Sequence, residues 1–234
     1  EADSVPFVAI PQILTKNPED FLWAAQVCRD RGYDEVNLNI GCPSGTVVSK
    51  GKGSGMLRNP EELDRFLDAV FAKSPLPISV KTRLGMENPE EFPALLEIFN
   101  RYPIQELTIH PRVRKQFYDG EVDLDMFRYA LENSKNPLCY NGDILSLSQA
   151  EALQRRYPAV EAVMIGRALV GDPGMLLAGG TDTAAVQKSR SGVLSGCVSI
   201  PCRNIHAPAE IVSLKDVENV SRLLAAVAQT EIEL

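Results

Sequence analysis

Several features that are common in other classes of protein are missing from this chain of 234 residues. No stretch approaches the roughly 18–20 consecutive apolar residues that a transmembrane helix needs, so we predict no membrane partner. The five cysteines form neither a C-x-x-C pair nor a zinc-finger spacing. Their odd number and scattered placement favour reduced thiols in a cytoplasmic protein.

Excess basic charge and an N-terminal targeting pattern are also missing. A net charge of −7 argues against a protein that coats nucleic acid non-specifically, although it is compatible with a local basic cleft. The N-terminus has neither the basic start nor the long apolar run of a signal peptide. Because a β-branched run begins almost at once, we expect that a further segment precedes this one. With 44% hydrophobic residues, the chain can still build a proper core.

What the sequence does contain is a repeated alternation of short β-branched runs and amphipathic helical stretches. Three helices begin alike, with Asn-Pro-Glu-Asp or Asn-Pro-Glu-Glu at Asn17, Asn59 and Asn88. Asn caps free amides, Pro at the first helical position lacks only an N–H that has no partner there, and the acids complement the helix dipole. The runs predict strands at residues 8–12, 34–40, 76–81, 105–110, 137–141 and 161–166.

Six consecutive βα units predict a parallel sheet covered by helices, but periodicity alone does not separate a barrel from an open doubly wound sheet. A polar or charged residue stands at or just past the end of each predicted strand: Gln12, Asn39, Lys81, His110, Asn141 and Arg167. In a (β/α)₈ barrel such ends converge on one mouth, where active sites are built. We therefore predict an α/β protein with a partial TIM (β/α)₈ barrel over residues 1–177 and a short α/β tail over residues 178–234. In this tail we expect helices that begin at residues 181 and 215 and a strand at residues 196–201.

The stretch Asn-Leu-Asn-Ile-Gly-Cys-Pro-Ser, residues 37–44, joins a predicted strand to a turn that carries a thiol. A thiol is mostly protonated at neutral pH, since its reference pKa is about 8.5. Cys42 can therefore be a nucleophile paired with His110, a general acid, or a small residue at a turn. The glycine-rich basic segment that follows, residues 47–58, lacks the order of a Walker P-loop and is either a functional loop or a flexible solvated one.

Side chains at the other strand ends fit a phosphorylated cofactor with an electron-poor ring. Lys81 and Arg83 end an apolar strand, where a buried cation is costly unless it meets an anion or an electron-rich acceptor. The segments 141–143 and 165–167 close the fifth and sixth strands, in the position where barrels often bind phosphate. Flavin mononucleotide (FMN) fits this set, with Gly142, Gly166 and Arg167 at the phosphate and Gln12 and Lys81 at the ring.

The motifs, taken in order, resemble those of the tRNA-dihydrouridine synthases. The resemblance rests on N-L-N-I-G-C-P-S, K-G-x-G-S-G-M-L, S-V-K-T-R-L-G, T-I-H-x-R, N-G-D-I and V-M-I-G-R, which lie within residues 5–177. It implies a TIM-barrel flavoenzyme that reduces the C5=C6 bond of uridine in tRNA, with FMN as cofactor and NADPH as reductant. It also implies that the family's first two βα units and its C-terminal helical domain are not part of this chain.

The same resemblance implies roles for individual residues. Cys42 would be the general acid that protonates C5, and Asn39 and Arg83 would bind the substrate base. The flavin-contacting positions would be Gln12, Lys81, His110, Asn141, Gly142, Asp143, Gly166 and Arg167. Because the base is stacked in folded RNA, such an enzyme must extract it. Basic residues would grip phosphates meanwhile; the candidates are Lys50, Lys52, Arg58, Arg112, Arg114 and Lys115.

The tail, residues 178–234, resembles instead the C-terminal end of the glutamyl-aminopeptidase and cellulase-M-like two-metal aminopeptidases. In that family the histidine of I-H-x-P-x-E is a metal ligand, which here is His206. One histidine cannot make a catalytic zinc site, so we predict no metal unless the tail itself is functional. Three hypotheses follow: an FMN-dependent tRNA-uridine reductase, an inactive chimera or fragment of an aminopeptidase, and a non-catalytic remnant that binds flavin or RNA.

Overall fold

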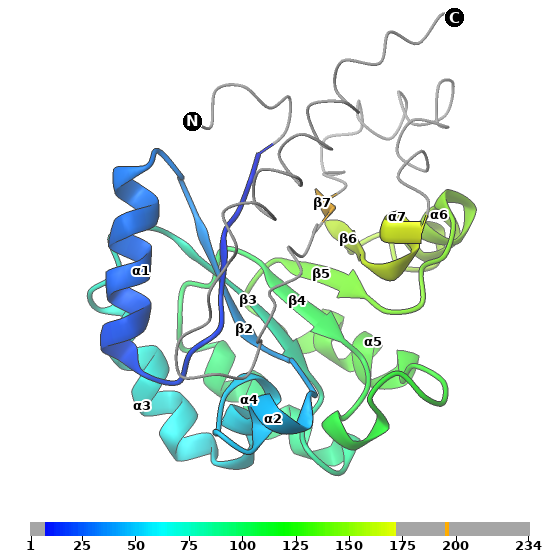
Figure 1. Cartoon of the computed structure of the whole chain (residues 1–234). Coiled ribbons are helices and arrows are strands. Elements are labelled where there is room, and N and C mark those ends of the chain that lie inside the picture. Colours follow the sequence, from blue (N-terminus) through cyan, green and yellow to red (C-terminus); the bar gives the residue numbers. More distant parts are fainter. Residues whose placement is uncertain (1–7, 172–194, 197–234) are drawn as a thin grey trace, which may run out of the picture.

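The computed structural model of the chain describes residues 8–171 and 195–196, and within them seven strands form a single sheet (Figure 1). The strands follow one another in chain order, and every neighbouring pair is parallel. They are β1 (Gln12–Ile13), β2 (Val36–Ile40), β3 (Ile78–Arg83), β4 (Leu107–His110), β5 (Leu138–Asn141), β6 (Ala162–Ile165) and β7 (Ser195–Gly196).

Helices occupy the connections between these strands. The α-helices are α1 (Pro18–Asp30), α2 (Gly45–Val48), α3 (Pro60–Phe71), α4 (Phe92–Phe99), α5 (Leu124–Asn133), α6 (Leu147–Arg156) and α7 (Arg167–Gly171). Three 3₁₀ helices lie among the described residues: η2 (Gly53–Arg58), η3 (Pro89–Glu91) and η4 (Arg114–Gln116). No helix in the described part of the chain combines the length and hydropathy that crossing a bilayer requires.

The strand order separates a barrel from a doubly wound sheet. In a doubly wound sheet the strand order reverses at a switch point, whereas in a barrel each strand is added beside the previous one. Here the order runs from β1 to β7 without reversal. Helices α1, α3, α4 and α5 pack against one another in chain order on the outside of the sheet (Figure 1). The predicted fold is therefore confirmed: six predicted parallel strands alternate with helices in a TIM-barrel-like wall.

The first strand is shorter than predicted and lies later in the chain. The β-branched run suggested residues 8–12, but β1 covers only Gln12–Ile13, which pair with Asn37 and Leu38. Val8 is 81% exposed, so this part of the run does not pack against the hydrophobic core. Of the strand predicted at residues 196–201, the described part contains only Gly196, in β7. The helices predicted to begin at residues 181 and 215 lie outside the described residues.

The three predicted helix starts are confirmed. Asn17 Oδ1 accepts the Glu19 N–H at 2.8 Å at the start of α1. Asn59 Oδ1 accepts two backbone N–H groups at 3.2 Å at the start of α3. At the third start Asn88 precedes η3, which runs directly into α4. The Asn17 and Asn59 side chains satisfy N–H groups that the first helical turn leaves without partners, whereas at the third start the Asn88 N–H donates to Glu91 Oε1 at 2.9 Å.

The alternation of residues along β2 shows how the sheet separates its core from its site. Val36, Leu38 and Ile40 are fully buried and belong to the hydrophobic core, which also includes side chains of α1 and α3. Successive side chains of a strand point to opposite faces, so Asn37 and Asn39 lie on the other face. There they form hydrogen bonds to polar side chains of β1 and β3. The inner face of the sheet is therefore polar, and it leads to the strand ends that form the site.

Candidate active site

A single cavity of about 490 Å³ gathers the residues predicted to act at the strand ends. This volume lies within the range of roughly 300–1,000 Å³ that small-molecule and cofactor sites occupy. All the predicted catalytic, cofactor-binding and substrate-binding residues line it: Gln12, Asn39, Cys42, Lys81, Arg83, His110, Asn141, Gly142, Asp143, Gly166 and Arg167. The structure therefore brings the whole predicted set together, while the role of each residue stays a prediction.

The turn after β2 presents Cys42 to this cavity in a fixed backbone conformation. Asn39 Oδ1 accepts the N–H groups of Gly41 and Cys42, at 3.1 Å and 3.0 Å. Arg83 Nε donates to the Gly41 carbonyl at 3.0 Å. Thus residues from both β2 and β3 hold the turn, and the thiol of Cys42, which is half-buried, lines the cavity.

A chain of side-chain amides fixes the orientation of Asn39 and Gln12. Backbone N–H groups only donate, so Asn39 must turn its side-chain oxygen toward the turn. Its side-chain nitrogen then points toward Gln12. Asn39 Nδ2 donates to Gln12 Oε1 at 2.8 Å, and Gln12 Nε2 donates to Asn37 Oδ1 at 2.8 Å. Asn37 Nδ2 then donates to Ser79 Oγ at 2.9 Å. Asn39 keeps a second amide hydrogen that it can donate to a ligand in the cavity.

His110 is held as a neutral hydrogen-bond donor. Its Nε2 lies 3.1 Å from Arg112 Nη1, and a guanidinium can only donate, so Nε2 accepts and Nδ1 carries the hydrogen. Burial, together with the positive charges of Arg83 and other nearby cations, lowers the pKa of His110 to about 2. A Cys-His nucleophilic pair needs a histidine that can become cationic, so this environment argues against a pair of Cys42 with His110.

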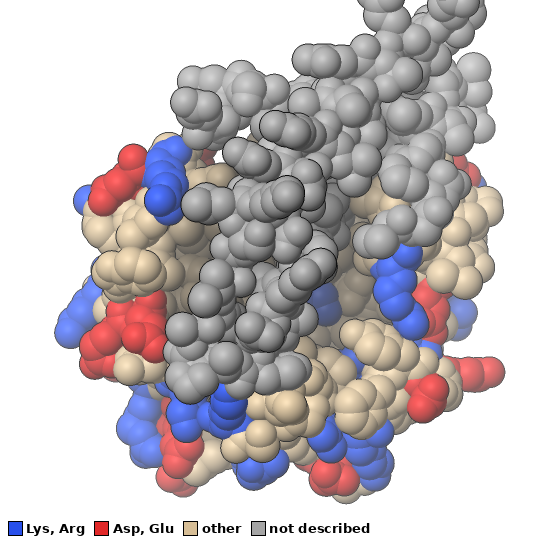
Figure 2. Space-filling view, viewed as in Figure 1, with Lys and Arg blue, Asp and Glu red and all other residues tan. Residues whose placement is uncertain are grey.

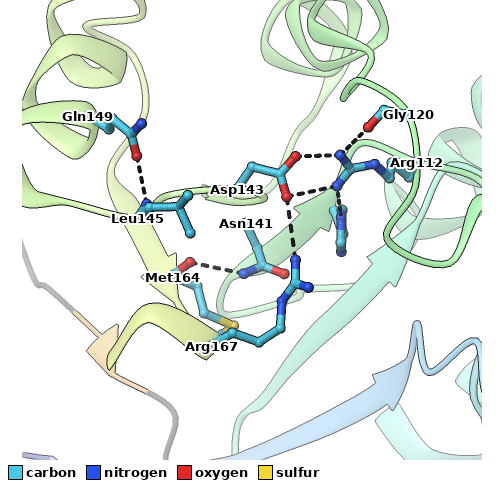
Figure 3. Close-up of polar contacts among 9 residues, drawn as sticks. Arg112, Gly120, Asn141, Asp143, Leu145, Gln149, Met164 and Arg167 are labelled. Carbon is cyan, nitrogen blue, oxygen red and sulfur yellow. Dashed lines mark hydrogen bonds and ion pairs between the residues drawn. The ribbon is translucent and has the colours of Figure 1, made fainter. Parts of the chain in front are cut away.

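Arg112 does not belong to an RNA-facing surface, and its predicted role as a phosphate grip is wrong. Its side chain is only 2% exposed, and Nη1 donates to Asp143 Oδ1 at 3.0 Å (Figure 3). Nη2 contacts Asp143 Oδ2 and the Gly120 carbonyl. The hydrogen bonds from Arg112 hold the pKa of Asp143 below its usual range. A basic residue after a strand predicts a surface cation, but here the loop folds back over it.

The ends of β5 and β6 form the side of the cavity that was predicted to take a phosphate. Asn141 Nδ2 donates to the Met164 carbonyl at 2.9 Å, which ties these two strand ends together (Figure 3). Arg167 lies 3.6 Å from Asp143 and keeps 65% of its side chain exposed. A Cβ added to Gly166 would meet no described atom within 4 Å, so the backbone there borders open space. An anionic group can therefore approach both the Gly166 backbone and the Arg167 guanidinium.

Sequence reasoning missed Tyr118, which also lines the cavity. Its ring lies 4.4 Å from the Arg167 guanidinium carbon and 5.5 Å from that of Arg83, so it links two predicted site residues. The only signal in the sequence is the aromatic pair Phe117-Tyr118 within a basic loop. The other lining residues that were not predicted are Gly41, Pro43, Ile144, Leu145, Met164 and Ala168.

The glycine-rich segment after Cys42 is not a flexible solvated loop. Within η2, residues 53–57 are all buried, and the segment packs against α2 and β2. Lys50 and Arg58, which lie on either side of these buried residues, are exposed. On the face drawn in Figure 2, Lys and Arg side chains are interspersed with Asp and Glu rather than gathered in one patch.

No group of three His, Cys, Asp or Glu side chains within residues 8–171 and 195–196 is arranged to hold a metal ion. His206, the metal ligand that the tail resemblance implies, lies outside those residues, so its role stays a prediction.

Comparison with solved structures supports the fold alone. The chain is similar to phosphoenolpyruvate phosphomutase from Streptomyces platensis subsp. rosaceus, with a TM-score of 0.53 and 17% identity over 97% of this chain and 82% of that one. It is also similar to a Coccidioides immitis protein assigned to the dihydrodipicolinate synthase family, with a TM-score of 0.54 and 14% identity over 82% of this chain and 61% of that one.

Sequence comparison is more specific. The chain is 35% identical to tRNA-dihydrouridine synthase B of Proteus vulgaris over 69% of its length and 50% of the relative's. It is 32% identical to tRNA-dihydrouridine synthase B of Klebsiella pneumoniae over 72% of its length and 52% of the relative's. The chain thus spans about half the length of the curated relatives it matches.

The family model described as dihydrouridine synthase (Dus) matches residues 3–213. That match continues beyond residue 177, where we predicted the boundary with the aminopeptidase-like tail, and the division of the chain at this point stays a prediction. The match covers most of the sequence and all the residues that line the cavity. On these grounds the chain belongs to the dihydrouridine synthase (Dus) family.

Proposed function

We propose that this chain reduces the C5=C6 bond of a uridine in tRNA, with FMN as cofactor and NADPH as reductant. The observation that carries the proposal is the cavity itself, because residues from six successive strand ends converge there on one thiol. Membership of the Dus family supports the same reaction, and the names of the relatives support tRNA as the substrate.

The donors around the cavity fit an anionic, phosphorylated flavin. Lys81, Arg83 and Arg167 supply positive charge, and neutral His110 supplies an N–H donor. Burial lowers the pKa of Arg83 to about 10, which still leaves its guanidinium protonated at neutral pH. Gln12 and Lys81 would hold the ring, and Gly142, Gly166 and Arg167 the phosphate; His110, Asn141 and Asp143 complete the set.

Cys42 is the proton donor in this proposal. Bound FMN would supply the hydride that C6 of the uracil accepts. The C5=C6 bond is conjugated to C4=O, so the base is then left as an enolate that needs a proton at C5. A protonated thiol can act as the general acid that gives this proton. His110 cannot serve instead, because its lowered pKa leaves it without an acidic proton in this range.

Asn39 and Arg83 would bind the base. Asn39 has a second amide hydrogen for a uracil carbonyl, and its orientation is fixed before substrate arrives. Arg83 lines the same cavity from β3 and places a positive charge near the carbonyl that gains negative charge. Because the base must leave its stack, exposed cations such as Lys50 and Arg58 would hold phosphates meanwhile.

The proposal is tested with the purified full chain, FMN, NADPH and an unmodified tRNA transcript. We expect flavin absorbance to co-purify or to be restored by added FMN, and dihydrouridine to appear in the digested tRNA by mass spectrometry. A colourless protein that cannot be loaded with FMN would contradict the proposal. A protein that binds FMN but forms no dihydrouridine would favour the non-catalytic remnant. Zinc-dependent cleavage of peptides would favour the aminopeptidase fragment.

A further inference from the structure

The carbonyl of Cys42 is held by a residue that lies twelve positions later in the chain. Ser54 donates to this oxygen twice, from its backbone N–H at 3.0 Å and from its hydroxyl at 2.8 Å. Ser54 is completely buried, so bulk water does not compete with the Cys42 carbonyl for the hydrogen bond from its hydroxyl. The bond therefore links the Cys42 turn directly to the buried helix η2.

This contact completes the fixation of the Cys42 backbone. The two peptide groups that flank its Cα contain only three hydrogen-bonding groups, because Pro43 has no N–H. Asn39 accepts the Cys42 N–H, Arg83 donates to the preceding carbonyl, and Ser54 donates to the following one. With both flanking peptides held, the position of the thiol depends on rotation about a single side-chain bond.

The close approach of Ser54 depends on the glycine before it. Gly53 has a φ of +57°, and a Cβ added there would lie 2.8 Å from the Cys42 carbonyl oxygen and 2.9 Å from the Cys42 Cβ. No L side chain fits that space, so the segment can come this near to Cys42 only as glycine. The segment is thus packed against the backbone and side chain of Cys42.

We infer that Ser54 is a positioning residue for Cys42: its hydroxyl and N–H hold the carbonyl of that turn and so keep the thiol aligned with the reacting base. The inference rests on the proposed function, in which Cys42 gives a proton to C5. A displacement of about 1 Å at a proton donor costs up to about a hundredfold in rate. Ser54→Ala keeps the N–H bond but removes the hydroxyl, so the turn is held less firmly.

The test compares Ser54→Ala with Ser49→Ala in the full chain. Ser49 is a matched control, since its exposed hydroxyl donates to the Thr46 carbonyl at 3.2 Å in the same segment. Two half-reactions are followed: reduction of bound FMN by NADPH, and formation of dihydrouridine in tRNA. Alkylation of Cys42 by iodoacetamide, located by peptide mass spectrometry, gives a readout that needs neither cofactor nor tRNA. Urea midpoints verify that both variants are folded.

We expect Ser54→Ala to slow dihydrouridine formation by about ten- to a hundredfold and to leave flavin reduction unchanged. Alkylation of Cys42 should accelerate as the turn opens, while Ser49→Ala matches the wild type in every measurement. Ser54→Thr keeps the hydroxyl and should recover most of the rate. Ser54→Ala behaving like Ser49→Ala, or folded Ser54→Thr as slow as Ser54→Ala, would overturn the inference. Should the wild type form no dihydrouridine, the proposed function fails, and alkylation alone still decides whether Ser54 holds Cys42.

Discussion

Gly53 offers a sharp test of how η2 is packed against Cys42, because two separate constraints meet at this residue. Its φ of +57° lies in the left-handed region, and an added Cβ would come within 2.8 Å of the Cys42 carbonyl oxygen. Two other glycines show each constraint alone. Gly32 has a φ of +84° but nothing within 4 Å of an added Cβ, whereas an added Cβ on Gly55 would lie 2.9 Å from the Val48 carbonyl oxygen.

The expected cost of Gly53→Ala is the sum of the two effects. An L residue in the left-handed region costs about 1–2 kcal/mol. Forcing an extra methyl group into a packed interior costs about 1–3 kcal/mol. Alanine also lowers the conformational entropy of the unfolded chain, which stabilises the folded state by about 0.4–1 kcal/mol. Every glycine-to-alanine change has this stabilising effect, so it cancels when two such variants are compared. Gly53→Ala should therefore lower the free energy of unfolding by about 1–3 kcal/mol more than Gly32→Ala does.

The assay is urea unfolding of the full chain and of four alanine variants, at Gly53, Gly32, Gly55 and Gly45. Gly45 is the control for both effects, since it has neither a positive φ nor an atom within 4 Å of an added Cβ. We expect the largest loss at Gly53, intermediate losses at Gly32 and Gly55, and little change at Gly45. A loss at Gly53 no larger than that at Gly32 would refute the close packing of η2 on Cys42.

Two further predictions concern the titratable side chains His110 and Asp143 of the site. His110 has a pKa of about 2 in the folded protein and about 6.5 in the unfolded chain. As pH falls below about 6.5, His110 therefore binds a proton only in the unfolded chain, and the free energy of unfolding falls by about 1.4 kcal/mol per pH unit. His110→Gln should remove this slope between about pH 6.5 and 5; an unchanged slope in urea unfolding would mean that His110 is not held neutral. Asp143→Asn leaves buried Arg112 without a charged partner, and with the Asp143 side chain 40% exposed we expect a loss of about 2 kcal/mol at neutral pH. Because the pKa of Asp143 is lowered on folding, the difference between wild type and Asp143→Asn should shrink as pH falls below about 4; a constant difference would contradict the ion pair.

The sequence predicted which side chains gather at the strand ends, because the signals for the strands and their ends are local. A parallel strand points its C-terminal end to one edge, so a polar residue at each predicted end was enough to bring Asn39, Lys81 and His110 together. The Asn-Pro-Glu starts likewise specify their helices through bonds within a few residues. For the helix starts, the deciding contacts lie within a few residues of the motif.

The failures involve contacts between distant segments. Arg112 was predicted to face RNA, yet it is buried by Gly120 and by Asp143, which lies 31 residues away. For residues 47–58 the sequence left a functional loop and a flexible solvated loop both open. The structure buries residues 53–57, where the glycines permit close packing on Cys42. Sequence periodicity carries no information about contacts between separate loops. It therefore predicts neither the hydrogen bonds from Ser54 to the Cys42 carbonyl nor the position of Tyr118 in the cavity.

The central claim is that Cys42 gives a proton to the base, and the measurement that tests it most directly is the pair of half-reactions in Cys42→Ala. The account predicts that NADPH still reduces bound FMN at the wild-type rate, while dihydrouridine formation falls by about 10²- to 10⁴-fold, the usual contribution of a positioned acid. Equal losses in both half-reactions would mean that Cys42 supports the structure. Undiminished dihydrouridine formation would mean that another group donates the proton.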